Sequence, residues 1–220
     1  MRELALPSGD LSVLCVGAHP DDIEIGCGAT LLLLNRSRRV HFTHLIMTGG
    51  SDRRREAQHA AGLFDGAEVI NHSYLDGRLP ASWDDVKSAL EDLAARQPAP
   101  DVIFAPRVDD AHQDHRLLGR LTTTTWRNSV VLHYDIPKWD GDFSPATTYV
   151  RIPEELARLK STHLHNAFPS QRDKDWWDEE LFLSVMRIRG MECRSRYAEA
   201  FVISKGVLSV MDSSAIEAVH

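Results

Sequence analysis

Residues 11–35 read LSVLCVGAHPDDIEIGCGATLLLLN, and this stretch decides the fold. The apolar, β-rich run at 11–18 predicts a buried strand, and the run at 26–35 predicts a helix. The loop between them is short, polar and acidic. A strand, a loop and a helix in this order form the repeating unit of parallel α/β folds, so we expect more such units along the chain.

The same alternation continues to residue 134. Hydrophobic patterning predicts further strands at 40–47, 67–71, 101–105 and 129–134, and further helices at 53–64, 83–96 and 114–126. Five strands separated by helices predict an α/β, Rossmann-like, doubly wound and mostly parallel sheet, with the strand order 3-2-1-4-5 and helices on both faces.

The last third of the chain has a different pattern. A loop rich in Pro, Gly and Asp is predicted at 137–146, followed by a strand at 147–152, a helix opened by Pro153, a helix at 178–190 and a strand at 200–208. A chain of 220 residues suits one domain. We therefore expect a single domain over 1–220, with a Rossmann-like core at 1–135 and a C-terminal strand and helix extension at 136–220.

Composition narrows the class of protein. The 32 acidic residues outnumber the 25 basic ones and the net charge is −7, so no electrostatic footprint for nucleic acid is present and a small-molecule substrate is favoured. The longest aliphatic run, at 31–34, is far below the roughly 20 residues of a membrane span. Three cysteines form no disulfide framework. These features predict a soluble, cytoplasmic protein.

Ionisable residues follow the first and the fourth predicted strands. The first of these loops reads AHPDD at 18–22, and the second reads DDAHQDH at 109–115. In an open parallel sheet, ligands bind beyond the carboxyl ends of the strands where the strand order reverses. If strands one and four are neighbours, the two loops meet at that point, and we expect one site built from both.

Two imidazoles and a carboxylate that converge on one point form a typical catalytic zinc set, with the fourth position left for water. Zinc lowers the pKa of this water to about 7, which generates a hydroxide nucleophile for amide hydrolysis. Asp21 is then a candidate general base, His112 a candidate oxyanion stabiliser or acid, and Asp114 a candidate partner that holds an imidazole in the required tautomer. Taken singly, each motif is also typical of a helix cap or a polar surface loop.

A dinucleotide site is the obvious competitor, because Gly26 and Gly28 follow the first strand. The third glycine of that fingerprint falls at Leu31, and the loop that should hold a pyrophosphate is acidic. Carboxylates repel phosphate and attract a cation. A metal site is therefore favoured over a nucleotide site.

The two motifs give the chain a family resemblance. Ala18-His19-Pro20-Asp21-Asp22 and His112-Gln113-Asp114-His115 resemble the signatures of the PIG-L/LmbE family of zinc-dependent N-acetylglucosaminyl deacetylases. The resemblance implies a Rossmann-like fold and removal of an acetyl group from an amino-sugar. It also implies roles for five residues: His19, Asp22 and His115 as metal ligands, Asp21 as general base and His112 as acid or electrostatic stabiliser.

Weaker similarity suggests three substrate-binding residues: Arg53, Asp76 and Tyr197. Each has a plainer interpretation, namely an intrahelical ion pair, a generic turn and a tyrosine at the edge of the core. Trp176 and Trp177 either stack on a sugar or staple the last helix, and stapling is favoured. The loop after the second strand is shorter than in many family members, which leaves the shape of the sugar pocket open.

The resulting hypothesis is a hydrolase that removes the N-acetyl group from an N-acetylglucosamine-type conjugate with one Zn²⁺ per chain, or with Fe²⁺ in its place. The alternatives are an amidase that cleaves a larger amide on an amino-sugar or thiol conjugate, a sugar- or metal-binding protein without turnover, and a nucleotide-binding protein. The aglycone and the oligomeric state, including a homo-oligomer, stay open.

Overall fold

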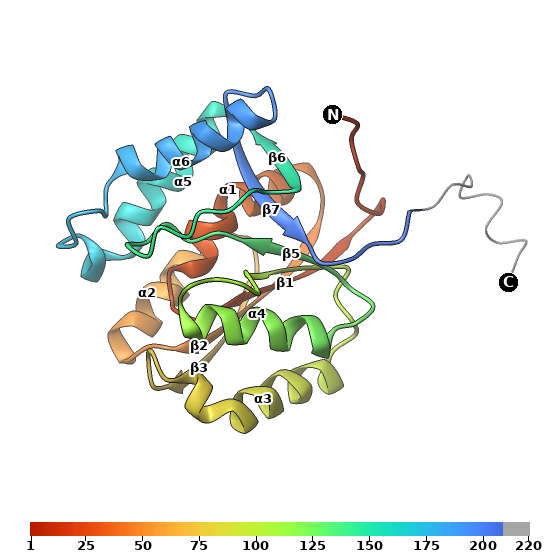
Figure 1. The fold of residues 1–220 in the computed structure, drawn as a ribbon, viewed down its shortest axis with the longest axis vertical. Helices are drawn as coiled ribbons and strands as arrows, with labels where there is room; N and C mark the ends of the chain where they lie inside the picture. The colour runs from red at the N-terminus through yellow and green to blue at the C-terminus, as the bar shows by residue number, and fades with distance from the viewer. Residues whose placement is uncertain (209–220) are drawn as a thin grey trace, which may run out of the picture.

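A computed structural model of the chain describes residues 1–208 (Figure 1). It contains one seven-stranded sheet with helices packed on both faces. The strands are β1 (Leu11–Gly17), β2 (Val40–Thr48), β3 (Glu68–Tyr74), β4 (Val102–Pro106), β5 (Val130–Tyr134), β6 (Thr148–Ile152) and β7 (Tyr197–Ile203). The helices are α1 (Asp22–Ser37), α2 (Ser51–Ala61), η1 (Leu79–Ser82), α3 (Trp83–Arg96), α4 (Gln113–Thr125), α5 (Glu154–Ala167), η2 (Pro169–Gln171) and α6 (Glu179–Glu192).

The strand order is β3-β2-β1-β4-β5-β7-β6, and it confirms the predicted order for the first five strands. These five are parallel, whereas β7 is antiparallel to both β5 and β6. Because β1 lies between β2 and β4, the strand order reverses at the carboxyl end of β1. The sheet continues from β5 into the C-terminal strands, while the division of the chain at residue 135 stays a prediction.

Each face of the sheet has its own apolar core. Along β1, Val13 and Cys15 belong to the core under α1, α2, α5 and α6, while Leu14 and Val16 belong to the core under α3 and α4 (Figure 1). This alternation follows from the two-residue period of a strand, and burial on both faces explains why the run is apolar throughout. Within residues 1–208, no helix is long and apolar enough to cross a bilayer.

Helix α1 begins at Asp22, four residues earlier than the pattern predicts. Gly26 therefore lies inside the helix, where an added Cβ would come within 2.3 Å of the Tyr134 ring. The Tyr134 hydroxyl donates to the Val16 carbonyl at 2.7 Å, which fixes this contact. The glycine that resembles part of a nucleotide fingerprint thus serves close helix-to-strand packing.

A buried ion pair contacts α1 beside this glycine. The Lys160 ammonium donates to Glu199 at 2.5 Å and to the Ile25 carbonyl at 2.6 Å. The Glu199 carboxylate in turn accepts the backbone amides of Ala29 and Thr30 at 3.0 and 2.6 Å. The pair therefore hydrogen-bonds to backbone groups of the helix, and it ties α1 to α5 and β7.

We expect Lys160→Met to lower the free energy of unfolding by about 3–5 kcal/mol, because it leaves the Glu199 charge buried without its counter-ion. Urea denaturation measures this loss. The exposed Lys205→Met is the matched control and should change the stability by less than about 0.5 kcal/mol. A loss no larger than that of the control would show that the buried pair contributes little to the fold.

Candidate active site

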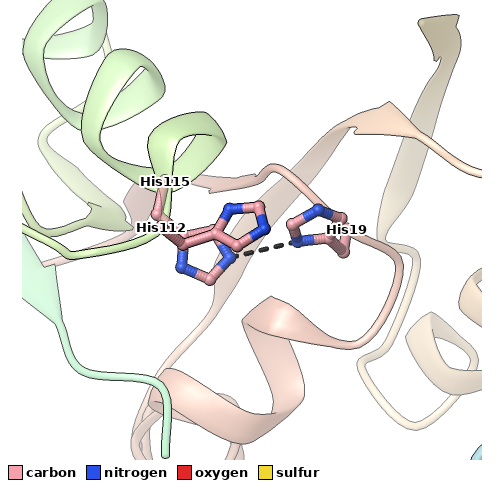
Figure 2. A group of neighbouring side chains, drawn as sticks. All are labelled: His19, His112 and His115. Atoms are coloured by element: carbon pink, nitrogen blue, oxygen red, sulfur yellow. Dashed lines mark hydrogen bonds between the residues drawn. The ribbon is translucent and has the colours of Figure 1, made fainter. Parts of the chain in front are cut away.

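The two predicted loops meet at the carboxyl end of the sheet, where they line an open cleft of about 760 Å³. The loop after β1 supplies His19 and leads into the first turn of α1, which carries Asp22. The loop after β4 supplies His112, the N-cap residue of α4, and His115 lies in the first turn of that helix. Figure 2 shows the three imidazoles facing one another from these two segments.

Three atoms in this group lie at metal-ligand separations. His19 Nδ1 is 3.0 Å from His115 Nε2, and Asp22 Oδ2 is 3.3 Å from His115 Nε2 and 3.5 Å from His19 Nδ1. In a tetrahedral zinc site with bonds of about 2.0–2.1 Å, ligand atoms lie about 3.3 Å apart. The separations of the three donor atoms are therefore close to those along one face of such a tetrahedron.

Both ring nitrogens of each of these two imidazoles have a partner. His19 Nε2 lies 3.0 Å from Asp76 Oδ1, and His115 Nδ1 lies 3.2 Å from Asp110 Oδ2. An N–H directed at a carboxylate fixes the tautomer and leaves the opposite nitrogen as the metal-facing lone pair. The backbone N–H of His19 donates to Asp22 Oδ2 at 2.9 Å, which also holds the third donor in place.

The electrostatics of the group favour a cation. Burial alone would lower the pKa of His115, but Asp22 and Asp110 outweigh it and raise this pKa to about 9. Burial also opposes the charged form of His19, yet Asp22 and the other neighbouring carboxylates overcome it and raise the pKa of His19. The pKa of Asp22 falls well below its ordinary value, because the two imidazoles outweigh its burial. Positive charge is thus stabilised between these residues, and a metal ion would displace protons from the imidazoles.

A second group of donor atoms surrounds the other side of His19. His19, Asp76 and Asp114 form a further potential metal group, and so do the three imidazoles His19, His112 and His115. The His112 ring lies 4.9 Å from the His19 ring and 4.7 Å from the His115 ring, between centroids. We favour the set of His19, Asp22 and His115, because its three donor atoms lie close together and each imidazole has a carboxylate on its opposite nitrogen.

Asp21 points into a different network. It is the N-cap residue of α1, yet its side chain makes no capping hydrogen bond. Its carboxylate instead pairs with the Arg53 guanidinium at 2.9 Å, and Arg53 also contacts Glu56 at 2.6 Å. Glu56 accepts the Ser170 hydroxyl at 2.7 Å. The predicted intrahelical pair of Arg53 and Glu56 is present, and the same arginine orients Asp21, which is 6% exposed and next to the candidate ligand Asp22.

His112 is held in one tautomer. Its Nδ1 accepts the backbone N–H of Asp114 at 3.3 Å, so Nε2 carries the proton of the neutral ring. Burial lowers the pKa of His112, and the charges of His115 and His19 lower it further. A neutral imidazole with an N–H donor is the form that can stabilise an oxyanion near neutral pH.

Asp114 contacts backbone amides more closely than it contacts an imidazole. Its carboxylate accepts the amides of Gly77 and Leu79 at 2.7 and 3.0 Å, while the His19 imidazole lies at 3.7 Å. Asp114 therefore anchors the turn after β3, and this turn carries Asp76 to His19. The sequence predicts a sugar contact for Asp76, but the contact that the structure shows is with an imidazole.

The remaining predicted residues lie in two different places. Tyr197 is the first residue of β7, is 6% exposed and packs in the apolar core, apart from the residues that line the cleft. This strand begins three residues earlier than the pattern predicts. Trp177 packs edge-on against Phe168 and Phe182, as expected of a staple, whereas Trp176 lines the cleft. The two tryptophans thus have separate roles.

The short loop after β2 forms one wall of the cleft through Gly49 and Gly50. Gly49 has a φ of +119°, and an added Cβ would approach Pro20 to 2.8 Å. Thr48 donates both its amide and its hydroxyl to the Ala18 carbonyl, at 3.0 and 2.7 Å. This loop therefore packs directly on the first loop and supports the backbone on both sides of His19.

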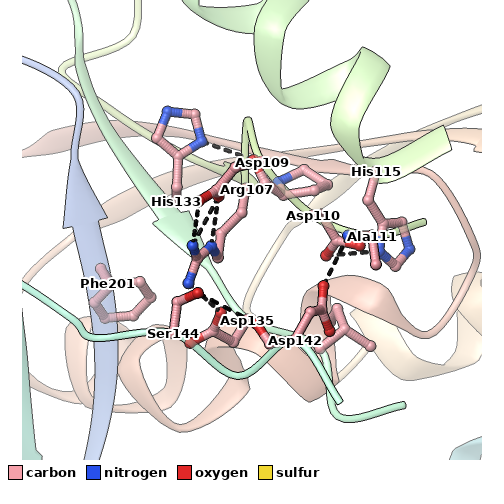
Figure 3. Close-up of polar contacts among 12 residues, drawn as sticks. Arg107, Asp109, Asp110, Ala111, His115, His133, Asp135, Asp142, Ser144 and Phe201 are labelled. Carbon is pink, nitrogen blue, oxygen red and sulfur yellow. Dashed lines mark hydrogen bonds and ion pairs between the residues drawn. The ribbon is translucent and has the colours of Figure 1, made fainter. Parts of the chain in front are cut away.

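Sequence reasoning missed Asp110, the carboxylate that faces His115 (Figure 3). Its other oxygen accepts the His112 amide at 2.7 Å, and Lys138 pairs with it at 3.1 Å. Arg107 holds the preceding part of the loop by bridging Asp109 and Asp135. The sequence offered one signal: Asp110 lies five residues before the predicted ligand His115. A loop that folds back on the N-terminus of the helix brings two residues at this spacing together.

We expect Asp110→Asn to weaken metal binding about ten- to hundredfold, because it removes the carboxylate that orients His115 and raises its basicity. The dissociation constant for Zn²⁺, measured by competition with a chelating dye, tests this. The neighbouring Asp109→Asn, which pairs with Arg107 and does not contact an imidazole of the metal set, should bind Zn²⁺ as the unchanged protein does. Equal affinities for the two variants would contradict a positioning role for Asp110.

Comparisons with known proteins identify the family of the chain. The family model described as PIG-L, GlcNAc-PI de-N-acetylase, matches residues 14–126. The uncharacterized deacetylase YaiS of Escherichia coli (strain K12) is 30% identical over 162 residues, which cover 69% of this chain and 83% of that protein.

Two solved structures show the same fold. The N,N'-diacetylchitobiose deacetylase from Pyrococcus horikoshii has a TM-score of 0.68 and 24% identity, with 93% of this chain and 88% of that chain covered. A conserved protein from Thermus thermophilus has a TM-score of 0.68 and 24% identity, with 91% of this chain and 97% of that chain covered.

Proposed function

Because this chain belongs to the PIG-L family of de-N-acetylases, we propose that it is a zinc-dependent hydrolase that removes the acetyl group from an N-acetylglucosamine-type conjugate. One observation carries the proposal. Three donor atoms from two loops converge at 3.0–3.5 Å beside the buried carboxylate of Asp21. Family membership supports the acetamide as the bond that is cleaved.

His19, Asp22 and His115 would hold the metal ion. When bound, zinc supplies Lewis acidity that polarises the acetamide carbonyl and lowers the pKa of water in the site. Fe²⁺ is compatible with the same histidine and carboxylate ligands, so the ligand types alone do not select zinc over iron. Asp76 and Asp110 keep the two imidazoles in the tautomers that this role requires.

Asp21 accepts the proton of the attacking water. Asp21 is buried, lines the cleft next to the ligand Asp22, and is held in a fixed orientation by Arg53. Water oxygen adds to the acetyl carbon, the carbon-to-nitrogen bond breaks, and the products are acetate and a free amine. The proton taken by Asp21 is available for the departing amine, so the residue acts first as base and then as acid.

His112 stabilises the charge that develops on the carbonyl oxygen. Its Nε2–H is available because Nδ1 accepts a backbone N–H, and its lowered pKa keeps the ring neutral. His112 lines the same cleft as Asp21, on the opposite loop. The two residues are therefore suited to act from two sides of the acetamide.

The volume of the cleft favours one alternative within the same chemistry. At about 760 Å³ it exceeds the space that a single acetamido-sugar needs, and its mouth is open. An amidase that removes a larger acyl group from an amino-sugar or thiol conjugate fits the same metal, base and oxyanion donor. Release of acetate compared with release of a bulky acyl group from matched substrates separates the two.

A mass-spectrometric screen of N-acetylglucosaminides, with and without a chelator, tests the proposed function. We expect loss of the acetyl mass from at least one conjugate, abolished by the chelator and restored by Zn²⁺. Turnover that survives complete removal of metal would contradict the proposal. We also propose a reducing, cytoplasmic location, which the three buried free thiols support.

A further inference from the structure

The cleft of this acidic protein is lined by basic as well as acidic side chains. Four basic and three acidic side chains line it, although the whole chain has 32 acidic and 25 basic residues. A bound divalent metal would add positive charge to the cleft. A basic side chain without a carboxylate partner in a cleft is a feature that an acidic substrate can recognise, because a cleft focuses the field of its lining charges.

Two of the four basic side chains already have carboxylate partners. Arg53 pairs with Asp21 at 2.9 Å. Lys138 pairs with Asp110 and Asp142 at 3.1 and 2.8 Å. These two cations position the catalytic loops, and their charge is largely neutralised by the carboxylates that they hold.

Arg54 and Lys174 are different. Neither makes an ion pair with any residue in the described range 1–208, although both line the cleft. Arg54 is half-buried on α2, whereas its neighbour Arg55 is exposed and pairs with Asp52 at 2.5 Å. Lys174 lies over the Trp176 ring, with Nζ 5.2 Å from the ring centroid. Arg54 and Lys174 are thus available to a ligand in the cleft.

We propose that the substrate carries a negatively charged aglycone, a carboxylate or a phosphate, that Arg54 and Lys174 recognise outside the catalytic centre. The inference rests on the proposed function, because it assigns the part of the conjugate that remains after the acetamide is placed at the metal. The volume of the cleft leaves room for such a group beside the sugar. Trp176 lines the same cleft.

Three N-acetylglucosaminides that differ only in the aglycone test this: one neutral alkyl, one with a terminal carboxylate and one with a phosphate. For at least one acidic substrate we expect a kcat/KM about tenfold above the neutral one, expressed mainly in KM and reduced by added salt. The carboxylate and phosphate arms show which acid is preferred. Equal kcat/KM values for all three substrates, at low salt, would overturn the inference.

Substitutions test whether Arg54 and Lys174 cause the preference for an acidic aglycone. Arg54→Gln and Lys174→Gln should each reduce the ratio of acidic to neutral kcat/KM about threefold, and together about tenfold. Arg55→Gln is the matched control and should leave the ratio unchanged. An unchanged ratio in the double variant would contradict the assignment. If the neutral and acidic substrates are deacetylated equally well, this inference is refuted and the proposed function stands. If no conjugate is deacetylated although the acidic ones bind tightly, the proposed function is refuted and this inference stands.

Discussion

Replacing Asp21 by Asn should lower kcat for deacetylation about 10²- to 10⁴-fold while the bound metal stays at the level of the unchanged protein. Asparagine keeps the size of the side chain but cannot accept the proton of the attacking water. The three donor atoms of the metal set do not include Asp21, so the ion should remain in place. Acetate release and metal content, measured on the same sample, separate these two effects.

The control for this variant is Asp52→Asn, which removes an exposed carboxylate on α2 that pairs with Arg55. Its kcat should equal that of the unchanged protein. Because Asp21 also pairs with Arg53, thermal unfolding of both variants checks that the fold is retained. Asp21→Asn with more than about a tenth of the original kcat would rule out a general base at this position.

Replacing His115 by Ala should weaken Zn²⁺ binding by more than about a hundredfold, beyond the loss expected for an orienting partner such as Asp110, and should abolish deacetylation at ordinary metal concentrations. The variant removes Nε2, the atom that lies within 3.3 Å of both other donors. Direct titration with Zn²⁺, followed by calorimetry, measures the change.

His41→Ala is a suitable comparison, since His41 is an exposed histidine on β2 away from the cleft. Its metal affinity and activity should match those of the unchanged protein. If His115→Ala bound Zn²⁺ as tightly as His41→Ala, the ion would be held by other residues, such as the second potential group around Asp76.

The arrangement of the first five strands could be predicted because the strands of the core read as apolar runs separated by helical patterns. The antiparallel placement of β7 beside β5 could not be predicted, because it depends on pairing between residues far apart in the chain, such as Tyr134 and Phe201. The start of α1 also differs from the prediction. The first turn of α1 contains the acidic residues Asp22 and Glu24, which are buried. Hydrophobic periodicity assigns acidic residues to the surface or to a loop, so it does not detect this turn.

The two loops of the candidate site could be predicted to meet, because both follow strands that flank the reversal in strand order. The residues that orient the side chains of these loops could not be predicted. Asp76 reaches His19 from a third loop, and its position depends on two backbone amides that Asp114 holds. Arg53 reaches Asp21 from the start of α2. Such contacts join residues far apart in the chain, and no local spacing encodes them.

The most direct test of zinc-dependent deacetylation is a titration of the metal-free protein with Zn²⁺ while acetate release from an N-acetylglucosamine conjugate is followed. We expect no release without metal, a linear rise in the rate as metal is added, and a break at one ion per chain. Full release by the metal-free protein, or a rate that does not depend on the added metal, would contradict it.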